Sequence, residues 1–288
     1  MLSKQLRNFL KNKSIFITGA AGSVGSELAR QIYRIGCKKL CLLDNNETGL
    51  FDIWEELPEA EPILADIRKR ERLKQVFNEK KPDIVFHTAA YKHIVMGEKF
   101  PCEIIRTNIN GFLNVVACSR QFKTEKVVFI STDKAVNPQS IMGLTKALGE
   151  RLCLIYNSWK PTRFIAVRFA NVLGSRGSVI PIWQKQMDEG KYLTVTDKRM
   201  ERYFMTMEEA CQLILEAAYL GKGGETFVLD MGKSVKILDL AKEIIIKSGK
   251  KVGIKIIGAK PGEKFKEELM TEEERKRAIK RGKLWIIK

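Results

Sequence analysis

An acid and a base stand side by side at Asp133 and Lys134, directly after the apolar segment 126–131. Thr132 places a hydroxyl just before them, and a second lysine, Lys146, follows within the next helical pattern. A carboxyl group beside an amine can carry protons to and from neighbouring atoms of one small substrate. This segment therefore predicts an enzyme that works by proton transfer.

A glycine-rich turn precedes these residues by about a hundred positions. Residues 19–25 read GxxGxxG between an apolar strand expected at 14–18 and a helix expected at 26–35. Such a turn lets the backbone approach a pyrophosphate at a positive helix N-terminus, although it can also be purely structural. Asp44 ends the next strand, where a carboxylate binds ribose and repels a 2′-phosphate, so we expect NAD rather than NADP. The cofactor contacts expected here are Gly19, Ala21, Gly22, Ser23, Val24, Gly25, Asp44, Asn45, Asp66 and Ile67.

Short apolar strands alternate with helices along the first part of the chain. This pattern predicts an α/β fold with a doubly wound parallel sheet of the Rossmann type over residues 1–170. Residues 171–288 are expected to form a smaller substrate-binding part, with 205–232 returning to the sheet layer. Further strands are expected at 39–43, 62–65, 84–87, 126–131, 164–168 and 226–229, and further helices at 71–80, 101–121, 142–158, 208–220, 237–248 and 272–283.

Composition excludes several classes of function. The formal net charge is +17, but the basic residues are dispersed and no nucleic-acid-binding motif is present, so we expect no nucleic-acid partner. Six scattered cysteines and two histidines predict no metal site. No apolar run is long enough for a membrane span, and no signal peptide is recognisable, so we expect a cytoplasmic protein. An amphipathic start, formed by Leu2, Leu6, Phe9 and Leu10, is expected to pack on its own domain rather than on a membrane.

Several segments together resemble the CapD-like polysaccharide biosynthesis family, within the extended short-chain dehydrogenases/reductases. The resemblance implies a nucleotide-sugar 4,6-dehydratase with NAD as cofactor and UDP-N-acetylglucosamine as substrate. The product would be a UDP-4-keto-6-deoxy sugar, and the enzyme would self-associate into a homo-oligomer. The segments that carry the resemblance are 22–28, 43–47, 87–93, 131–138, 168–174, 177–181, 202–206 and 261–264.

The resemblance also implies a role for each residue. Lys134 would remove the carbon-5 proton, which requires a depressed pKa, and Asp133 would protonate the departing 6-hydroxyl, which requires shielding from water. Thr132 would hydrogen-bond the sugar near its 4-hydroxyl, and Lys146 would bind the nicotinamide ribose. Further cofactor contacts would be Ala89, Ala90, Lys92, Asn108 and Ser131. Substrate contacts would be His93, Asn171, Ser178, Val179, Arg202, Lys260 and Glu263, with Lys260 standing where many relatives have arginine.

Met142 departs from the wider family, which has tyrosine four residues before the lysine. A thioether cannot accept the 4-hydroxyl proton. The methionine resembles a subgroup that retains configuration at carbon 5, so we expect retention. The alternatives are a carbon-5-inverting dehydratase, a UDP-sugar 4-epimerase and a noncatalytic NAD-binding regulator. Long relatives carry transmembrane helices upstream, and this chain is expected to be a soluble catalytic-domain form.

Overall fold

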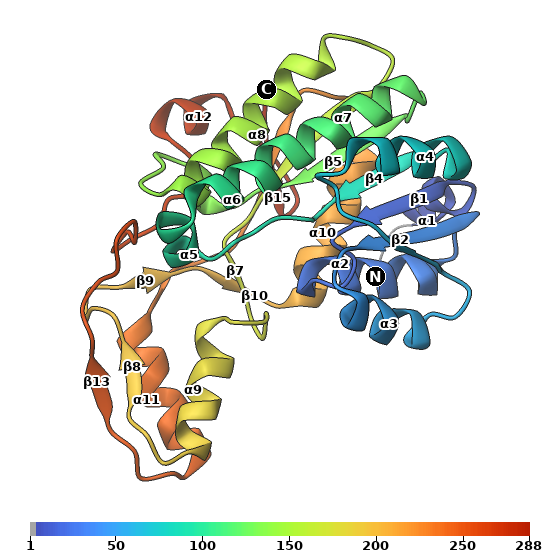
Figure 1. The fold of residues 1–288 in the computed structure, drawn as a ribbon. Coiled ribbons are helices and arrows are strands. Elements are labelled where there is room, and N and C mark those ends of the chain that lie inside the picture. Colours follow the sequence, from blue (N-terminus) through green and yellow to red (C-terminus); the bar gives the residue numbers. More distant parts are fainter. Residues whose placement is uncertain (1–3) are drawn as a thin grey trace.

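The computed structural model describes residues 4–288, and in this part of the chain nine strands form one sheet (Figure 1). The strand order is β14-β15-β11-β6-β5-β4-β1-β2-β3. All neighbours from β3 to β11 are parallel, while β15 and β14 join the edge antiparallel. The strands are β1 Ser14–Thr18, β2 Lys39–Asp44, β3 Glu61–Leu64, β4 Ile84–His87, β5 Lys126–Ile130, β6 Arg163–Arg168, β11 Thr226–Leu229, β14 Ile279–Arg281 and β15 Leu284–Ile287.

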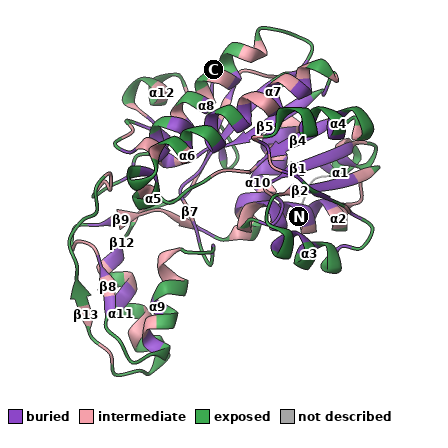
Figure 2. Ribbon diagram, viewed as in Figure 1, coloured by how far each residue is buried: buried purple, intermediate pink, exposed green. Residues whose placement is uncertain are grey.

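Helices cover both faces of this sheet, and their apolar sides fill two cores. The first core includes α1 Lys4–Lys11, α2 Ser23–Ile35, α3 Glu47–Glu56 and α10 Met207–Leu220. The second includes α4 Arg70–Lys80, α7 Phe112–Gln121 and α8 Ile141–Asn157. Figure 2 shows the strands buried between these layers. The predicted doubly wound α/β fold is confirmed.

The order of strands reverses beside β1, which has β2 on one side and β4 on the other. Helices leave the sheet toward opposite faces at such a point, so a crevice opens at the carboxyl ends of the strands. Thr18 and His87 pair at the ends of β1 and β4 and mark the floor of this crevice. The glycine turn follows β1 directly, so the sheet topology places it in the crevice.

A smaller lobe extends from the sheet layer (Figure 1). Its own apolar core surrounds Trp183, which is fully buried on α9. Short strand pairs outside the main sheet are β7 Asn171–Val172 with β10 Phe204–Met205, β9 Glu201–Arg202 with β12 Val235–Lys236, and β8 Leu193–Val195 with β13 Ile254–Ile256. The lobe's helices are α9 Val179–Asp188 and α11 Ile237–Ser248. We did not predict α9, α3 or the short helix α5 Ile94–Lys99.

Two predicted helices differ from the structure. The helix predicted over 272–283 is wrong beyond α12 Glu272–Arg277, because the chain turns at Gly282 and β14 pairs with β15 at the sheet edge. The helix predicted over 101–121 is divided into α6 Pro101–Ile105, a π-helical turn at Arg106–Gly111 and α7.

The amphipathic N-terminal helix packs on its own domain, as predicted. Leu6 and Leu10 of α1 are buried in the first core. The prediction for Leu2 lies outside the described residues. Within residues 4–288, no helix combines the length and apolar character that crossing a membrane requires.

Candidate active site

Two hollows lie over the carboxyl ends of the central strands. The larger has a volume of about 860 Å³ and the smaller about 240 Å³, and they share Gly22, Thr88, Ala90, Tyr91 and Arg176 among their lining residues. Predicted residues lining the larger are Gly22, Ser23, Val24, Gly25, Ala90, Lys92, His93, Ser131, Thr132, Lys134, Met142, Lys146, Asn171 and Ser178. Those lining the smaller are Gly19, Ala21, Gly22, Asp44, Asn45, Asp66, Ile67, Ala89 and Ala90.

The glycine turn has the shape that a dinucleotide pyrophosphate needs. Gly19 has φ +73°, and a Cβ on Gly25 would lie 2.2 Å from the Gly19 carbonyl oxygen, so both positions require glycine. Helix α2 begins at Ser23 and directs its free N–H groups toward the cavity. Asp44 accepts hydrogen bonds of 2.9 Å from the backbone N–H groups of Ala21 and Asn46, which fix its carboxylate beside the smaller hollow. The turn, the helix N-terminus and the fixed carboxylate fit a dinucleotide cofactor.

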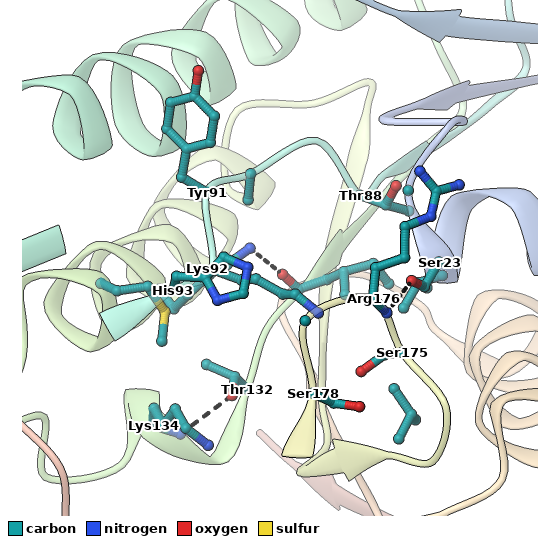
Figure 3. A pocket seen from close by; sticks show the side chains of 18 of the residues that line it. Ser23, Thr88, Tyr91, Lys92, His93, Thr132, Lys134, Ser175, Arg176 and Ser178 are labelled. Atoms are coloured by element: carbon teal, nitrogen blue, oxygen red, sulfur yellow. Dashed lines mark hydrogen bonds between the residues drawn. The ribbon is translucent and has the colours of Figure 1, made fainter. Parts of the chain in front are cut away.

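The acid–base pair lies where β5 ends. A 3-10 turn, Asp133–Ala135, follows the strand, and the Thr132 side chain caps it. The Asp133 side chain is fully buried, and its Oδ1 accepts hydrogen bonds of 2.9 Å from both Thr132 Oγ1 and Lys134 Nζ. Asp133 is therefore shielded from water, as predicted. Its two hydrogen-bond partners, Thr132 and Lys134, line the cavity (Figure 3).

The protonation of Lys134 differs from the prediction. Burial lowers the pKa of Lys134, but the carboxylates of Asp133 and Glu267 outweigh burial and raise the pKa above its usual value. Glu267 Oε1 lies 3.6 Å from Lys134 Nζ, and its side chain is 1% exposed. The expected depressed pKa is therefore wrong for the structure as it stands, because the sequence did not reveal the second carboxylate.

Lys146 and Met142 lie one turn apart on α8. Lys146 Nζ donates a 2.7 Å hydrogen bond to the Ile130 carbonyl and lies over the Phe129 ring. Burial lowers the pKa of Lys146 to about 8. Met142 is 2% exposed and lines the cavity, so a sulfur atom stands on the wall where a phenol would otherwise be available.

A buried ionic network supports the cavity from below. Ser131 Oγ donates to Glu150 Oε1 at 2.6 Å, and Arg168 Nε donates to the same oxygen at 2.9 Å. Arg168 also donates to Glu274 Oε2 at 2.8 Å and to the Leu269 carbonyl at 3.0 Å. This network, which we did not predict, ties the segment before α12 to the sheet beneath the acid–base pair.

Several predicted contacts do not line either hollow. Asn108 is buried behind the wall, where its amide bonds the Tyr91 backbone and Thr145 Oγ1. Arg202 donates to the carbonyls of Glu201 and Phe265. Residues outside the lining of both hollows are Asn108, Asp133, Val179, Arg202, Lys260 and Glu263.

Arg176 is the main lining residue that sequence reasoning missed. Its backbone N–H donates to Ser23 Oγ at 3.1 Å, and Figure 3 shows its side chain beside Thr88 and Ser23. Arg176 lines both hollows, as Gly22 of the glycine turn does. The available signal was an arginine inside the glycine- and serine-rich loop at 174–178. Nothing in the sequence placed Glu267 beside Lys134.

Comparison with known proteins identifies close relatives. A profile of the family described as "Polysaccharide biosynthesis protein" matches residues 15–288. The chain is 48% identical to the capsular polysaccharide biosynthesis protein CapD of Staphylococcus aureus, over 92% of this chain and 46% of that protein. It is 34% identical to a Campylobacter jejuni UDP-N-acetylglucosamine 4,6-dehydratase (inverting), over 91% of this chain and 78% of that protein. The chain spans about half the length of the first curated relatives it matches.

Solved structures share the fold. Pen from Bacillus thuringiensis superposes with a TM-score of 0.92 at 37% identity, covering 97% of this chain and 90% of that one. A Streptomyces venezuelae dTDP-glucose 4,6-dehydratase with bound NAD has a TM-score of 0.81 at 19% identity, covering 91% and 89% of the two chains, and supports the fold alone.

An epimerase is also among the relatives found by sequence. A UDP-glucose 4-epimerase of Rickettsia canadensis is 34% identical, over 96% of this chain and 83% of that protein. The relatives therefore include both nucleotide-sugar dehydratases and epimerases.

Proposed function

The chain belongs to the polysaccharide biosynthesis protein family, and we propose that it dehydrates UDP-N-acetylglucosamine to a UDP-4-keto-6-deoxy sugar with NAD as cofactor. The observation that carries this proposal is the Asp133–Lys134 pair, hydrogen-bonded at 2.9 Å, in which Asp133 is buried and Lys134 lines the cavity together with Lys146. Elimination of water needs an acid and a base on one small region of the sugar, and this pair supplies both.

A proposed route for the 4-hydroxyl proton, in place of the missing phenol, runs through Thr132. Thr132 Oγ1 lines the cavity and hydrogen-bonds Asp133 Oδ1 at 2.9 Å. Thr132 can accept the 4-hydroxyl proton while it passes its own proton to Asp133. NAD, when bound, supplies the acceptor that takes hydride from carbon 4 and returns it to carbon 6. Because the Met142 thioether cannot accept the 4-hydroxyl proton, we infer that this proton leaves through Thr132 and Asp133.

The remaining proton transfers then balance. Lys134 takes the carbon-5 proton, and Asp133 gives the proton it received to the departing 6-hydroxyl, which leaves as water. Lys134 returns its proton to carbon 5 when carbon 6 is reduced, so both side chains end as they began. Because one amine both removes and returns the carbon-5 proton from the same side, we propose retention of configuration. Lys134 must lose its resting proton before this sequence begins, since the adjacent carboxylates raise its pKa.

We propose the following contacts to the cofactor and the substrate. Gly19, Gly22 and Gly25 would hold the cofactor pyrophosphate, Asp44 its adenosine ribose and Lys146 its nicotinamide ribose. His93, Asn171 and Ser178 line the larger cavity and would contact the substrate. Arg202, Lys260 and Glu263 are proposed to meet the diphosphate and uridine, which requires them to leave their present hydrogen bonds.

A direct assay tests the activity. The purified protein is incubated with UDP-N-acetylglucosamine, with and without added NAD, and products are followed by NMR. We expect a 4-keto-6-deoxy product, whereas UDP-N-acetylgalactosamine would establish the epimerase and overturn the proposal. In deuterated water, the product ring couplings report carbon-5 configuration, and an inverted ring would overturn retention.

Paired variants assign the chemistry to the acid–base pair. Asp133→Asn and Lys134→Met should each lower turnover at least about a hundredfold, in line with the loss of one general acid or base. The exposed residues Asp52 and Lys251 provide the controls Asp52→Asn and Lys251→Met, which should keep wild-type turnover. Full turnover in Asp133→Asn would rule out the proposed proton route.

A further inference from the structure

Glu267 is a buried acid in contact with the acid–base pair. Its side chain is 1% exposed, and Oε1 lies 3.6 Å from Lys134 Nζ. Its Oε2 is buried and makes no hydrogen bond within residues 4–288, and Lys264 Nζ lies 3.9 Å from it. Burying a carboxylate with so few hydrogen bonds costs free energy, so its position calls for a charge-balancing role.

The segment that carries Glu267 is fixed on both sides. Two residues before it, the Phe265 carbonyl accepts a 2.8 Å hydrogen bond from the Glu201 backbone N–H. Two residues after it, the Leu269 carbonyl accepts a 3.0 Å hydrogen bond from Arg168 Nη1. The backbone on both sides of Glu267 is therefore tied, to the small lobe on one side and to the sheet on the other.

Charge on the pair changes during the proposed reaction. Once Asp133 holds the 4-hydroxyl proton, it is neutral and no longer balances Lys134. Lys134 becomes an ammonium when it takes the carbon-5 proton from the sugar. Among the described residues, Asp133 and Glu267 are the two carboxylates paired with this amine, so Glu267 is then its remaining counter-charge.

We infer that Glu267 is a positioning residue that holds Lys134 toward the sugar and balances its charge after it has taken the carbon-5 proton. This inference rests on the proposed function, because it assigns Lys134 as the base. Charged groups that act on Lys134 are Asp133, Glu267 and Arg202, and Lys264 faces Glu267 from the other side. Lys264 Nζ also donates to the Val136 carbonyl at 2.5 Å, which holds it near the pair.

The test is the pH profile of kcat/KM in Glu267→Gln. On the acid side of the profile, activity rises with pH as Lys134 loses its proton. Removing a neighbouring negative charge lowers the pKa of Lys134, so this rise, the acid limb, should move about one pH unit lower. Maximal turnover should fall about tenfold, because the ammonium formed in the reaction lacks its counter-charge. Glu268→Gln is the matched control, since Glu268 is exposed and bonds Asn137, and it should leave the limb in place.

A second variant should shift the acid limb in the opposite direction. Lys264→Met removes a positive charge beside Glu267 and should move the acid limb to higher pH. A limb that stays at its wild-type position in both variants, with melting temperature and NAD binding unchanged, would overturn the inference. Lys134→Met separates the two proposals. Normal turnover of Lys134→Met would refute the proposed function. If Lys134→Met is inactive but the pH profile of Glu267→Gln is unshifted, only the role of Glu267 is refuted.

Discussion

Ser23 and Arg176 are joined by a 3.1 Å hydrogen bond although 153 positions separate them in the chain. Ser23 begins α2 at the glycine turn, and Arg176 lies in the loop after β7. The bond runs from the Arg176 backbone N–H to Ser23 Oγ, so it fixes the loop whatever the Arg176 side chain does. The loop that leads into the small lobe is therefore held against the glycine turn.

Arg176→Ala should weaken NAD binding about tenfold, because a guanidinium near the pyrophosphate would be lost while the backbone hydrogen bond remains. Isothermal titration at two salt concentrations measures this, and the loss should shrink at high salt. Arg34→Ala, at an exposed position late in α2, is the control. Equal affinity in both variants would show that Arg176 does not contact the cofactor.

Gly177→Ala should raise the KM for the nucleotide sugar. Gly177 has φ +69°, and an added Cβ would lie 2.7 Å from the His93 ring, so the loop or the imidazole must move. Gly174→Ala is a matched control, because Gly174 has φ +72° with no atom within 4 Å of an added Cβ. Both variants carry the same backbone strain, and only the first displaces His93. The same KM in both would argue against a role for this contact.

Arg168→Met should destabilise the fold by about 3 kcal/mol, because it leaves two partly buried carboxylates without their partner. Glu150 and Glu274 both accept hydrogen bonds from Arg168, whose side chain is 3% exposed. Urea unfolding followed by circular dichroism gives the change in free energy. Arg163→Met, at the exposed start of the same strand, should change it by less than about 1 kcal/mol. A similar small loss in both would contradict the assigned network.

Acid should destabilise the protein partly through His87. Burial, and to a smaller extent the charge of Lys146, lowers the pKa of His87 to about 3 from its usual 6.5, so the folded ring stays neutral in this window while the unfolded ring takes up a proton. The unfolded state then binds more protons, and stability falls as pH drops from about 6.5 toward 3, by at most about 1.4 kcal/mol per pH unit.

His87→Phe isolates this contribution. The variant keeps an aromatic ring between Phe112 and Phe129 but loses the hydrogen bond to Thr18 Oγ1. Its free energy of unfolding should therefore fall less steeply than that of the wild type between pH 6.5 and 4. Parallel curves for the two proteins would show that His87 does not titrate on unfolding.

Local patterns in the sequence predicted the parts of the site that are close together along the chain. Asp133 and Lys134 are neighbours, and the glycine turn follows its strand directly, so strand–helix alternation was enough to place both at one edge of the sheet. The contact between Glu267 and Lys134 depends on how a distant segment folds back, and no periodicity records it. The mixed charges after residue 271 suited a helix, but pairing of β14 with β15 at the sheet edge overrode that preference beyond Arg277.

The order in which a ribosome delivers this chain gives the late position of Glu267 a consequence. The cofactor turn and the acid–base pair emerge within the first half of the chain, and domains begin to fold from the N-terminal side. Glu267, the Arg168 partners at 269 and 274, and strands β14 and β15 emerge more than a hundred residues later. The nascent protein can therefore shape the crevice beside the glycine turn well before Lys134 has both of its carboxylate partners.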